Sequence, residues 1–338
     1  MSPASTQASF KVSEFCLVSS GLSYPEGPIY RPDGSVLVVE IKAGTLTRVL
    51  PDGTNAVVAN VGGGPNGAAI GPDGAVYIAN DGGMEFIPIG NLFISGDQPP
   101  SPPYTSGSIQ RVDSAGTVTT LYTSVQAFNP FTQQMETHPL KGPDDLVFDS
   151  TGSFWFTDWG KSRNGGRERD ITGIYYAKPD GSSIAEKVFP MAAPNGIALS
   201  PDEKRLYVAE TYSRRVLYFE LSAPGTIKPN PNSTDGAYVL ANTAGILDSM
   251  AVDEQGNVYA ITMLPHGFNP ATNGGITVIS PGGEILEFIE INIGEPDPLP
   301  SNLCFGGPDR KTAFITLGGS GRLVSARMRV AGKKLAFS

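Results

Sequence analysis

The stretch YPEGPIYRPDGSVLVVEI, residues 24–41, decides the fold because its pattern recurs along the chain. A short apolar run leads from Glu26 to a tight turn at Gly34, and a run of β-branched residues follows. Five further copies keep the same eight-residue distance from the Glu26 position to the turn. The residues at the Glu26 position in these copies are Asn66, Asp144, Asn195, Asp248 and Asn302.

Each copy has the composition of four short strands separated by turns. In the first copy the third and fourth strands are TLTRVL and NAVVANV, joined by a PDG turn at residues 51–53. Most copies begin 40 to 54 residues apart, which is typical of a β-propeller blade. The sequence therefore predicts an all-β fold, a six-bladed β-propeller with four antiparallel strands per blade, as one domain over residues 1–338.

The two ends of the repeat array carry further predictions. Too few residues follow Asn302 for a full blade, so we expect the N-terminal FKVSEFCLV, residues 10–18, to join the last blade and close the ring. Asn66 and Asp144 lie 78 residues apart, which predicts an insertion in the second blade. We place this insertion at about residues 81–108 and interpret it as a loop or lid over the channel, with an exposed tether as the alternative.

Composition limits the partners and the compartment. The formal net charge is -9, the pI is near 4.8, and no basic patch stands out, which argues against nucleic acid and anionic membranes. The start of the chain has no apolar segment after a basic stretch, and no window approaches 18 consecutive apolar residues. We therefore expect a cytoplasmic protein whose two cysteines, Cys16 and Cys304, stay reduced. The oligomeric state is not indicated.

The repeated position predicts a metal site. In a propeller the innermost strands surround a central channel, so six oxygen-bearing side chains, three of them carboxylates, would meet at one mouth. Three converging carboxylates cost several kcal/mol without a cation, and oxygen ligands without His or Cys favour Ca²⁺. Asp and Asn also recur before tight turns for folding reasons alone, although Glu26 is a methylene too long for that role.

Four motifs resemble the regucalcin and gluconolactonase (SMP-30/gluconolactonase/LRE-like) family of six-bladed propellers, closer to its bacterial lactonase branch. They are YPEGP, PNGIALSPDEKRLYVAET, DSMAVDEQGNVYA and SNLCFGGPDRKTAFIT, and the resemblance spans residues 22–324. It implies a divalent ion, Ca²⁺ or alternatively Mg²⁺, Mn²⁺ or Zn²⁺, bound by Glu26, Asn195 and Asp248. Asp144 is either a further ligand or a group that binds substrate and water, and Asp145 is a candidate for a second, structural calcium.

The resemblance also implies hydrolysis of a small ester, most often a lactone. The cation would polarise the carbonyl, and Asp248 would act as both ligand and general base toward water. A nucleophilic role for Ser249 has no G-x-S-x-G elbow to support it. The further candidates for substrate contact are Asn66, Asp145, Ser249, Asn302, His138, Trp159, Tyr212 and His266.

Two other functions stay open on sequence grounds. One is a phosphotriester hydrolase of the fluorophosphatase type, although Ala251 stands where that branch has a further Asp. The other is a non-catalytic calcium-binding propeller, since a fold alone does not confer a function. His138 and His266, the only histidines, lie in no matching motif.

Overall fold

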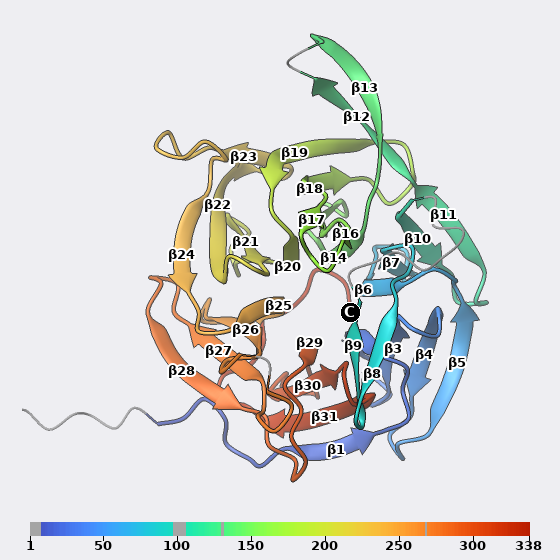
Figure 1. Ribbon diagram of the computed structural model, residues 1–338, viewed down its shortest axis with the longest axis vertical. Helices are drawn as coiled ribbons and strands as arrows, with labels where there is room; N and C mark the ends of the chain where they lie inside the picture. The colour runs from blue at the N-terminus through green and yellow to red at the C-terminus, as the bar shows by residue number, and fades with distance from the viewer. Residues whose placement is uncertain (1–7, 97–105, 130–131, 268) are drawn as a thin grey trace, which may run out of the picture.

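The computed structural model describes residues 8–96, 106–129, 132–267 and 269–338, and six antiparallel sheets surround a central channel in it (Figure 1). The predicted six-bladed β-propeller is therefore confirmed. No helix occurs among the described residues. Within the same ranges, nothing helical is both long and apolar enough to cross a membrane.

The first three blades follow the repeat from the innermost strand outward. Blade 1 consists of β2 (Pro25–Tyr30), β3 (Val36–Glu40), β4 (Thr45–Val49) and β5 (Asn55–Asn60). Blade 2 consists of β6 (Pro65–Ile70), β7 (Val76–Asn80), β10 (Ser108–Val112) and β11 (Val118–Tyr122). Blade 3 consists of β14 (Pro143–Phe148), β15 (Phe154–Asp158), β18 (Thr172–Ala177) and β19 (Ile184–Met191).

The last three blades complete the ring. Blade 4 consists of β20 (Pro194–Leu199), β21 (Arg205–Glu210), β22 (Arg215–Ala223) and β24 (Tyr238–Asn242), with the short β23 (Thr226–Lys228) also paired to β22. Blade 5 consists of β25 (Ile246–Val252), β26 (Val258–Met263), β27 (Gly275–Ile279) and β28 (Ile285–Glu290). Blade 6 consists of β29 (Pro300–Gly306), β30 (Thr312–Leu317), β31 (Arg322–Arg327) and β1 (Cys16–Ser19).

The N-terminal strand closes the ring, as predicted. β1 pairs antiparallel with β31, with Cys16 opposite Ser325, and so supplies the outermost strand of the last blade. Cys304 lies on the innermost strand of the same blade, and both thiols are free. Closure by the two ends of the chain leaves no unpaired edge between the first and last blades.

The second strand of each blade lies in the densest part of the fold. β3, β7, β15 and β26 are buried along their whole length, because each blade packs against a neighbour on both faces. A large aromatic residue occupies the interior of this strand in blades 2 to 5, and its side chain is at most 1% exposed. These residues are Tyr77, Trp155, Tyr207 and Tyr259.

Three hairpins extend from the blades in the part of the chain that the structure describes. β8 (Phe86–Ile89) and β9 (Leu92–Ser95) lie within the predicted insertion at 81–108, of which residues 97–105 fall outside the described part of the chain. The extra length of the second repeat is shared with a second hairpin, β12 (Ser124–Asn129) and β13 (Gln134–Pro139), which the repeat did not predict. The third is β16 (Ser162–Arg163) and β17 (Glu168–Arg169). Strand-like composition alone does not separate such hairpins from blade strands.

Candidate functional site

A register irregularity marks the repeated polar position in every blade. In blade 1 the pairing of β2 with β3 shifts between Glu26 and Ile29. In blades 2 to 5 the shift spans the equivalent residue, and in blade 6 it comes directly before Asn302. A β-bulge re-aims the side chain that it carries. The bulges therefore turn six side chains, one from each blade, toward the channel axis; we call them the polar ring.

Close packing around the polar ring explains the glycine that follows several of its members. Gly27 has a φ of 50°, and a Cβ there would lie 2.7 Å from the backbone N of Ala68 and 2.9 Å from the backbone O of Asn66. A Cβ on Gly196 would lie 2.8 Å from the backbone O of Asp248. Only glycine lets neighbouring innermost strands approach this closely.

Five members of the polar ring line one cavity of about 250 Å³ at the mouth of the channel. They are Glu26, Asn66, Asp144, Asn195 and Asp248. The sixth, Asn302, does not line this cavity but donates from Nδ2 to Oε2 of Glu26 at 2.8 Å. The structure thus brings together the four predicted metal ligands and one predicted substrate contact, Asn66.

Acids and amides alternate around the polar ring. Asn66 donates from Nδ2 to Oδ2 of Asp144 at 3.1 Å, as Asn302 does to Glu26. Two oxygens keep no hydrogen-bond partner although they are buried, namely Oδ1 of Asp144 and Oδ1 of Asn195. Buried oxygens of this kind are normally satisfied, so two partnerless oxygens on residues that line the cavity fit a site for a cation or a hydrogen-bond donor.

Burial and mutual repulsion govern the acids of the cavity. Burial raises the pKa of Glu26 and of Asp144 well above the ordinary range, and the charge of Asp248 raises both further. Burial likewise raises the pKa of Asp248 to about 7, while a side-chain hydrogen bond with Asn195 lowers it. These acids therefore disfavour one another's charge, which a bound cation would reverse.

Other buried acids of the chain show what a structural role looks like. Asp158, at the end of β15, accepts hydrogen bonds from the backbone N–H groups of Lys141 and Gly142, both at 2.7 Å. Glu40, at the end of β3, accepts from the backbone N–H of Ser23 at 2.5 Å. These carboxylates hold loops by satisfied hydrogen bonds. The polar ring differs because its acids face the cavity and each other.

The donor chemistry fits a hard cation, although carboxylates alone do not complete a site. Among the residues the structure describes, no three His, Cys, Asp or Glu side chains group closely enough to hold a metal ion. A site here needs the amide oxygen of Asn195 beside the carboxylates of Glu26, Asp144 and Asp248. All-oxygen donors of mixed charge suit Ca²⁺ better than Zn²⁺.

A buried lysine, ion-paired with an aspartate, forms part of the cavity wall, and sequence reasoning missed it. Lys161 lines the cavity, and its Nζ lies 3.2 Å from Oδ1 of Asp81 and 2.8 Å from the backbone O of Gly83. The side chains of Lys161 and Asp81 are only 3% and 4% exposed. Asp81 directly follows β7, the second strand of its blade, as Trp159 directly follows β15. The residues that follow the second strands could therefore have been chosen from the sequence as candidates for the cavity wall.

An aromatic platform forms the adjoining wall. The predicted residues Trp159 and Tyr212 both line the cavity, with ring centroids 6.0 Å apart. The guanidinium of Arg169 lies 4.3 Å from the Trp159 ring and 4.1 Å from the Tyr212 ring. Trp159 also donates from Nε1 to Oγ1 of Thr211 at 3.2 Å. The β16–β17 hairpin, which carries Arg169, thus fixes both rings.

The remaining predicted contacts lie away from this cavity. Asp145 lines a second cavity on the other side of the polar ring, and Ser249 lies beside Asp145. His138 lies on β13 of the projecting hairpin, where Nε2 is 4.0 Å from Oε2 of Glu136. His266 is exposed in the loop after β26, two residues from the cavity residue Leu264. Roles for these residues stay predictions.

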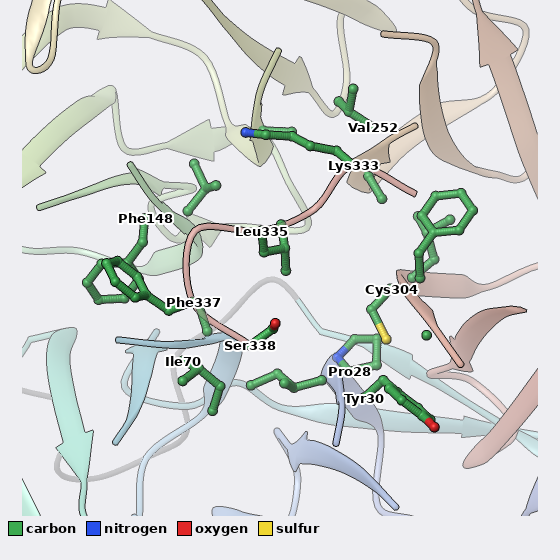
Figure 2. A pocket seen from close by; sticks show the side chains of 18 of the residues that line it. Pro28, Tyr30, Ile70, Phe148, Val252, Cys304, Lys333, Leu335, Phe337 and Ser338 are labelled. Atoms are coloured by element: carbon green, nitrogen blue, oxygen red, sulfur yellow. The ribbon is translucent and has the colours of Figure 1, made fainter. Parts of the chain in front are cut away.

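The second cavity, about 440 Å³, is the larger of the two, but its lining differs in kind. Figure 2 shows the C-terminal residues 333–338 crossing it, with Phe337 beside Phe148 and Cys304 facing the same space. The rings of Phe148 and Phe337 meet edge to face at 5.9 Å. Its walls are mainly apolar, so the smaller cavity, where the acids meet, is the candidate functional site.

Residues 24–319 match the family model described as SMP-30/gluconolactonase/LRE-like region. A gluconolactonase of Zymomonas mobilis is 27% identical over 323 residues, covering 89% of this chain and 78% of that protein. The lactonase drp35 of Staphylococcus saprophyticus is 41% identical over 118 residues, a segment that covers 34% of either chain.

Solved structures show the same fold at lower identity. A gluconolactonase of Xanthomonas campestris superposes with a TM-score of 0.66 at 21% identity, over 93% of this chain and 89% of that chain. A regucalcin of Agrobacterium tumefaciens, described as a calcium-binding protein, gives a TM-score of 0.66 at 16% identity over 96% of both chains. At these identities the likeness concerns the fold.

Proposed function

Because the chain belongs to the SMP-30/gluconolactonase/LRE-like family, we propose that it is a divalent-metal-dependent hydrolase that opens the ester bond of a small lactone. The relatives named gluconolactonase and lactonase support the reaction class. The regucalcin likeness, with the all-oxygen donor set, supports Ca²⁺ as the ion.

One observation carries the proposal. Glu26, Asp144 and Asp248 face a single cavity together with the partnerless buried oxygens of Asp144 and Asn195. An arrangement that raises the pKa of every acid in it opposes folding, so it needs a functional reason. Binding a cation and activating water supply that reason.

The residues of the polar ring take separate roles in the proposed reaction. Glu26, Asn195, Asp248 and Asp144 would hold the ion, which would polarise the lactone carbonyl and stabilise the charge that develops on its oxygen. Asn302 and Asn66 donate to Glu26 and Asp144 and so orient these two carboxylates. We assign the proton transfer to Asp248, a carboxylate that lines the cavity and is held by a side-chain hydrogen bond with Asn195.

The proton balance is simple. A carboxylate oxygen of Asp248 takes a proton from water as the water oxygen bonds to the carbonyl carbon. The ring C–O bond then breaks, and the same proton passes to the departing alkoxide oxygen. The product is one hydroxy acid, and Asp248 ends in its starting state.

A lactone panel assayed by acid release tests the proposal. Purified protein is dialysed against chelator and assayed with aldonolactones, aliphatic lactones, aromatic lactones and paraoxon, before and after Ca²⁺, Mg²⁺, Mn²⁺ or Zn²⁺ is restored. We expect lactone turnover that chelation abolishes and one ion restores best. Asp248→Asn should lower kcat by at least about 100-fold, in the range of a lost general base.

An exposed aspartate provides the matched control. Asp180 sits in a turn and accepts the backbone N–H of Ser182 at 2.9 Å, so Asp180→Asn changes the same atoms away from the cavity. Its activity should equal that of the unaltered protein. Turnover that persists in chelator, metal-dependent turnover of paraoxon alone, or full activity in Asp248→Asn would each refute the proposal.

A further inference from the structure

The wall of the candidate cavity is divided by blade. Lys161, Thr211 and the aromatic platform come from blades 3 and 4, whereas the opposite side presents mainly aliphatic and thioether side chains from blades 5, 6 and 1 and from the β8–β9 hairpin. The polar members of that side, Tyr24 and Ser95, share a side-chain hydrogen bond. We call this opposite side the apolar arc. It is formed by Ile41, Ile94, Ile246, Met263, Leu264 and Leu299.

The apolar arc continues the core of the protein. Met263 and Leu299 belong to the hydrophobic cluster between blades 5 and 6, and Ile94, Ile246 and Leu264 pack against that cluster. The β8–β9 hairpin is held over it by a hydrogen bond from the backbone N of Phe93 to the backbone O of Gly319, at 2.8 Å. The arc is thus a fixed apolar surface of the cavity.

Several polar groups on the other side already have protein partners. Thr211 accepts from Trp159, and the ammonium of Lys161 is held by Asp81 and by the backbone O of Gly83. In the polar ring, Asn66 donates to Asp144. A ligand with hydroxyls on every ring carbon would leave several of them against the apolar arc, where each loses water without gaining a partner.

From this asymmetry, and resting on the proposed function, we propose that the substrate is a lactone with an alkyl or aryl substituent and not a polyhydroxylated sugar lactone. The carbonyl faces the polar ring, and the substituent lies on the apolar arc. Each methylene buried there strengthens binding by about fourfold. A buried hydroxyl in the same place weakens it by a similar or larger factor.

A series of γ-lactones with growing alkyl chains, compared with glucono-δ-lactone, tests this substrate class in the metal-loaded protein. We expect kcat/KM to rise by about fourfold per methylene over the first few carbons, and to exceed that for glucono-δ-lactone by at least about tenfold. Ile246→Thr, which keeps a β-branched residue on β25, should flatten the chain-length dependence and lower the preference for alkyl lactones over glucono-δ-lactone. Ile94→Thr on the hairpin offers the same test should the first variant fold poorly.

Ile285→Thr is the control, because Ile285 lies on the outermost strand of blade 5 with 47% of its surface exposed. It should keep the full chain-length dependence. Glucono-δ-lactone turned over faster than every alkyl lactone would overturn this inference and leave the proposed hydrolase intact. If no lactone is hydrolysed, the proposed function fails, and thermal shifts with the same ligands still decide the inference: shifts that do not grow with chain length overturn it.

Discussion

Asp248→Asn should change stability in opposite directions with and without metal. In the metal-free protein the pKa of Asp248 is raised from 3.8 to about 7, so its charge opposes the fold. At 1.36 kcal/mol per pKa unit the shift amounts to about 4 kcal/mol, an upper figure since the side chain is half-buried and water screens it. Replacement by neutral Asn should therefore raise the free energy of unfolding by about 1–4 kcal/mol at pH 8.

The stability difference between Asp248→Asn and the unaltered protein should depend on pH. A folded pKa above the unfolded value stabilises the fold below about pH 4, and this contribution is lost as the pH rises through 7. In chelator, the advantage of Asp248→Asn should thus be near zero at pH 4 and largest above pH 7. With Ca²⁺ at about 1,000 times its Kd, the unaltered protein should gain about 4.1 kcal/mol, and the variant much less.

Guanidinium denaturation at pH 4 and pH 8, in chelator and in Ca²⁺, measures all four values, with Asp180→Asn as the matched neutralisation. The order of stability should reverse when metal is added at pH 8. A variant that is less stable than the unaltered protein in chelator at pH 8, or Ca²⁺ that stabilises both equally, would refute the reasoning that these acids repel one another until a cation binds.

Three further outcomes test other parts of the structure by the same denaturation measurement. Gly27→Ala should lower the free energy of unfolding by about 2–3 kcal/mol, because the new Cβ would lie 2.7 Å from backbone. Gly74→Ala, with a φ of 77° and open space around it, should lower it by only about 1 kcal/mol, and equal losses would contradict the close approach at Gly27. Lys161→Met should lower the free energy of unfolding by about 3–5 kcal/mol, because it leaves the buried carboxylate of Asp81 without its cation. The double variant Lys161→Met with Asp81→Asn should recover much of this loss, and no recovery would contradict the ion pair. Phe337→Ala should lower the free energy of unfolding by about 1–2 kcal/mol and leave lactone turnover unchanged. Lost turnover would show that the second cavity takes part in the reaction.

Much of the fold could be predicted because one position repeats. The distance from Glu26 to Gly34 recurs six times, and each recurrence is an innermost strand followed by a tight turn. Glu203 and Arg310 hold the turn position where glycine is absent, with φ values of 55° and 54°. The β12–β13 hairpin escaped prediction because it belongs to no repeat.

Residues near the channel were predictable only where they lie in the repeat. Asp144 and Asp145 are neighbours in sequence, yet they line different cavities: Asp144 lines the smaller one, and residues 145–148 all line the larger one. Asp81, Lys161 and Arg169 lie after second strands or on a hairpin, where no period marks them. Their roles depend on contacts between blades, which spacing along one chain does not reveal.

The C-terminal residues 333–338 affect how substrate can enter the channel and how product can leave it. They cross the channel on the side of the polar ring opposite the candidate site, and hydrogen bonds such as that from Asn302 to Glu26 connect neighbouring blades between the two cavities. We therefore expect the channel to be closed at that end. Substrate and product would then pass through the same mouth of the channel. Bound product would block substrate entry, so accumulated product should inhibit competitively.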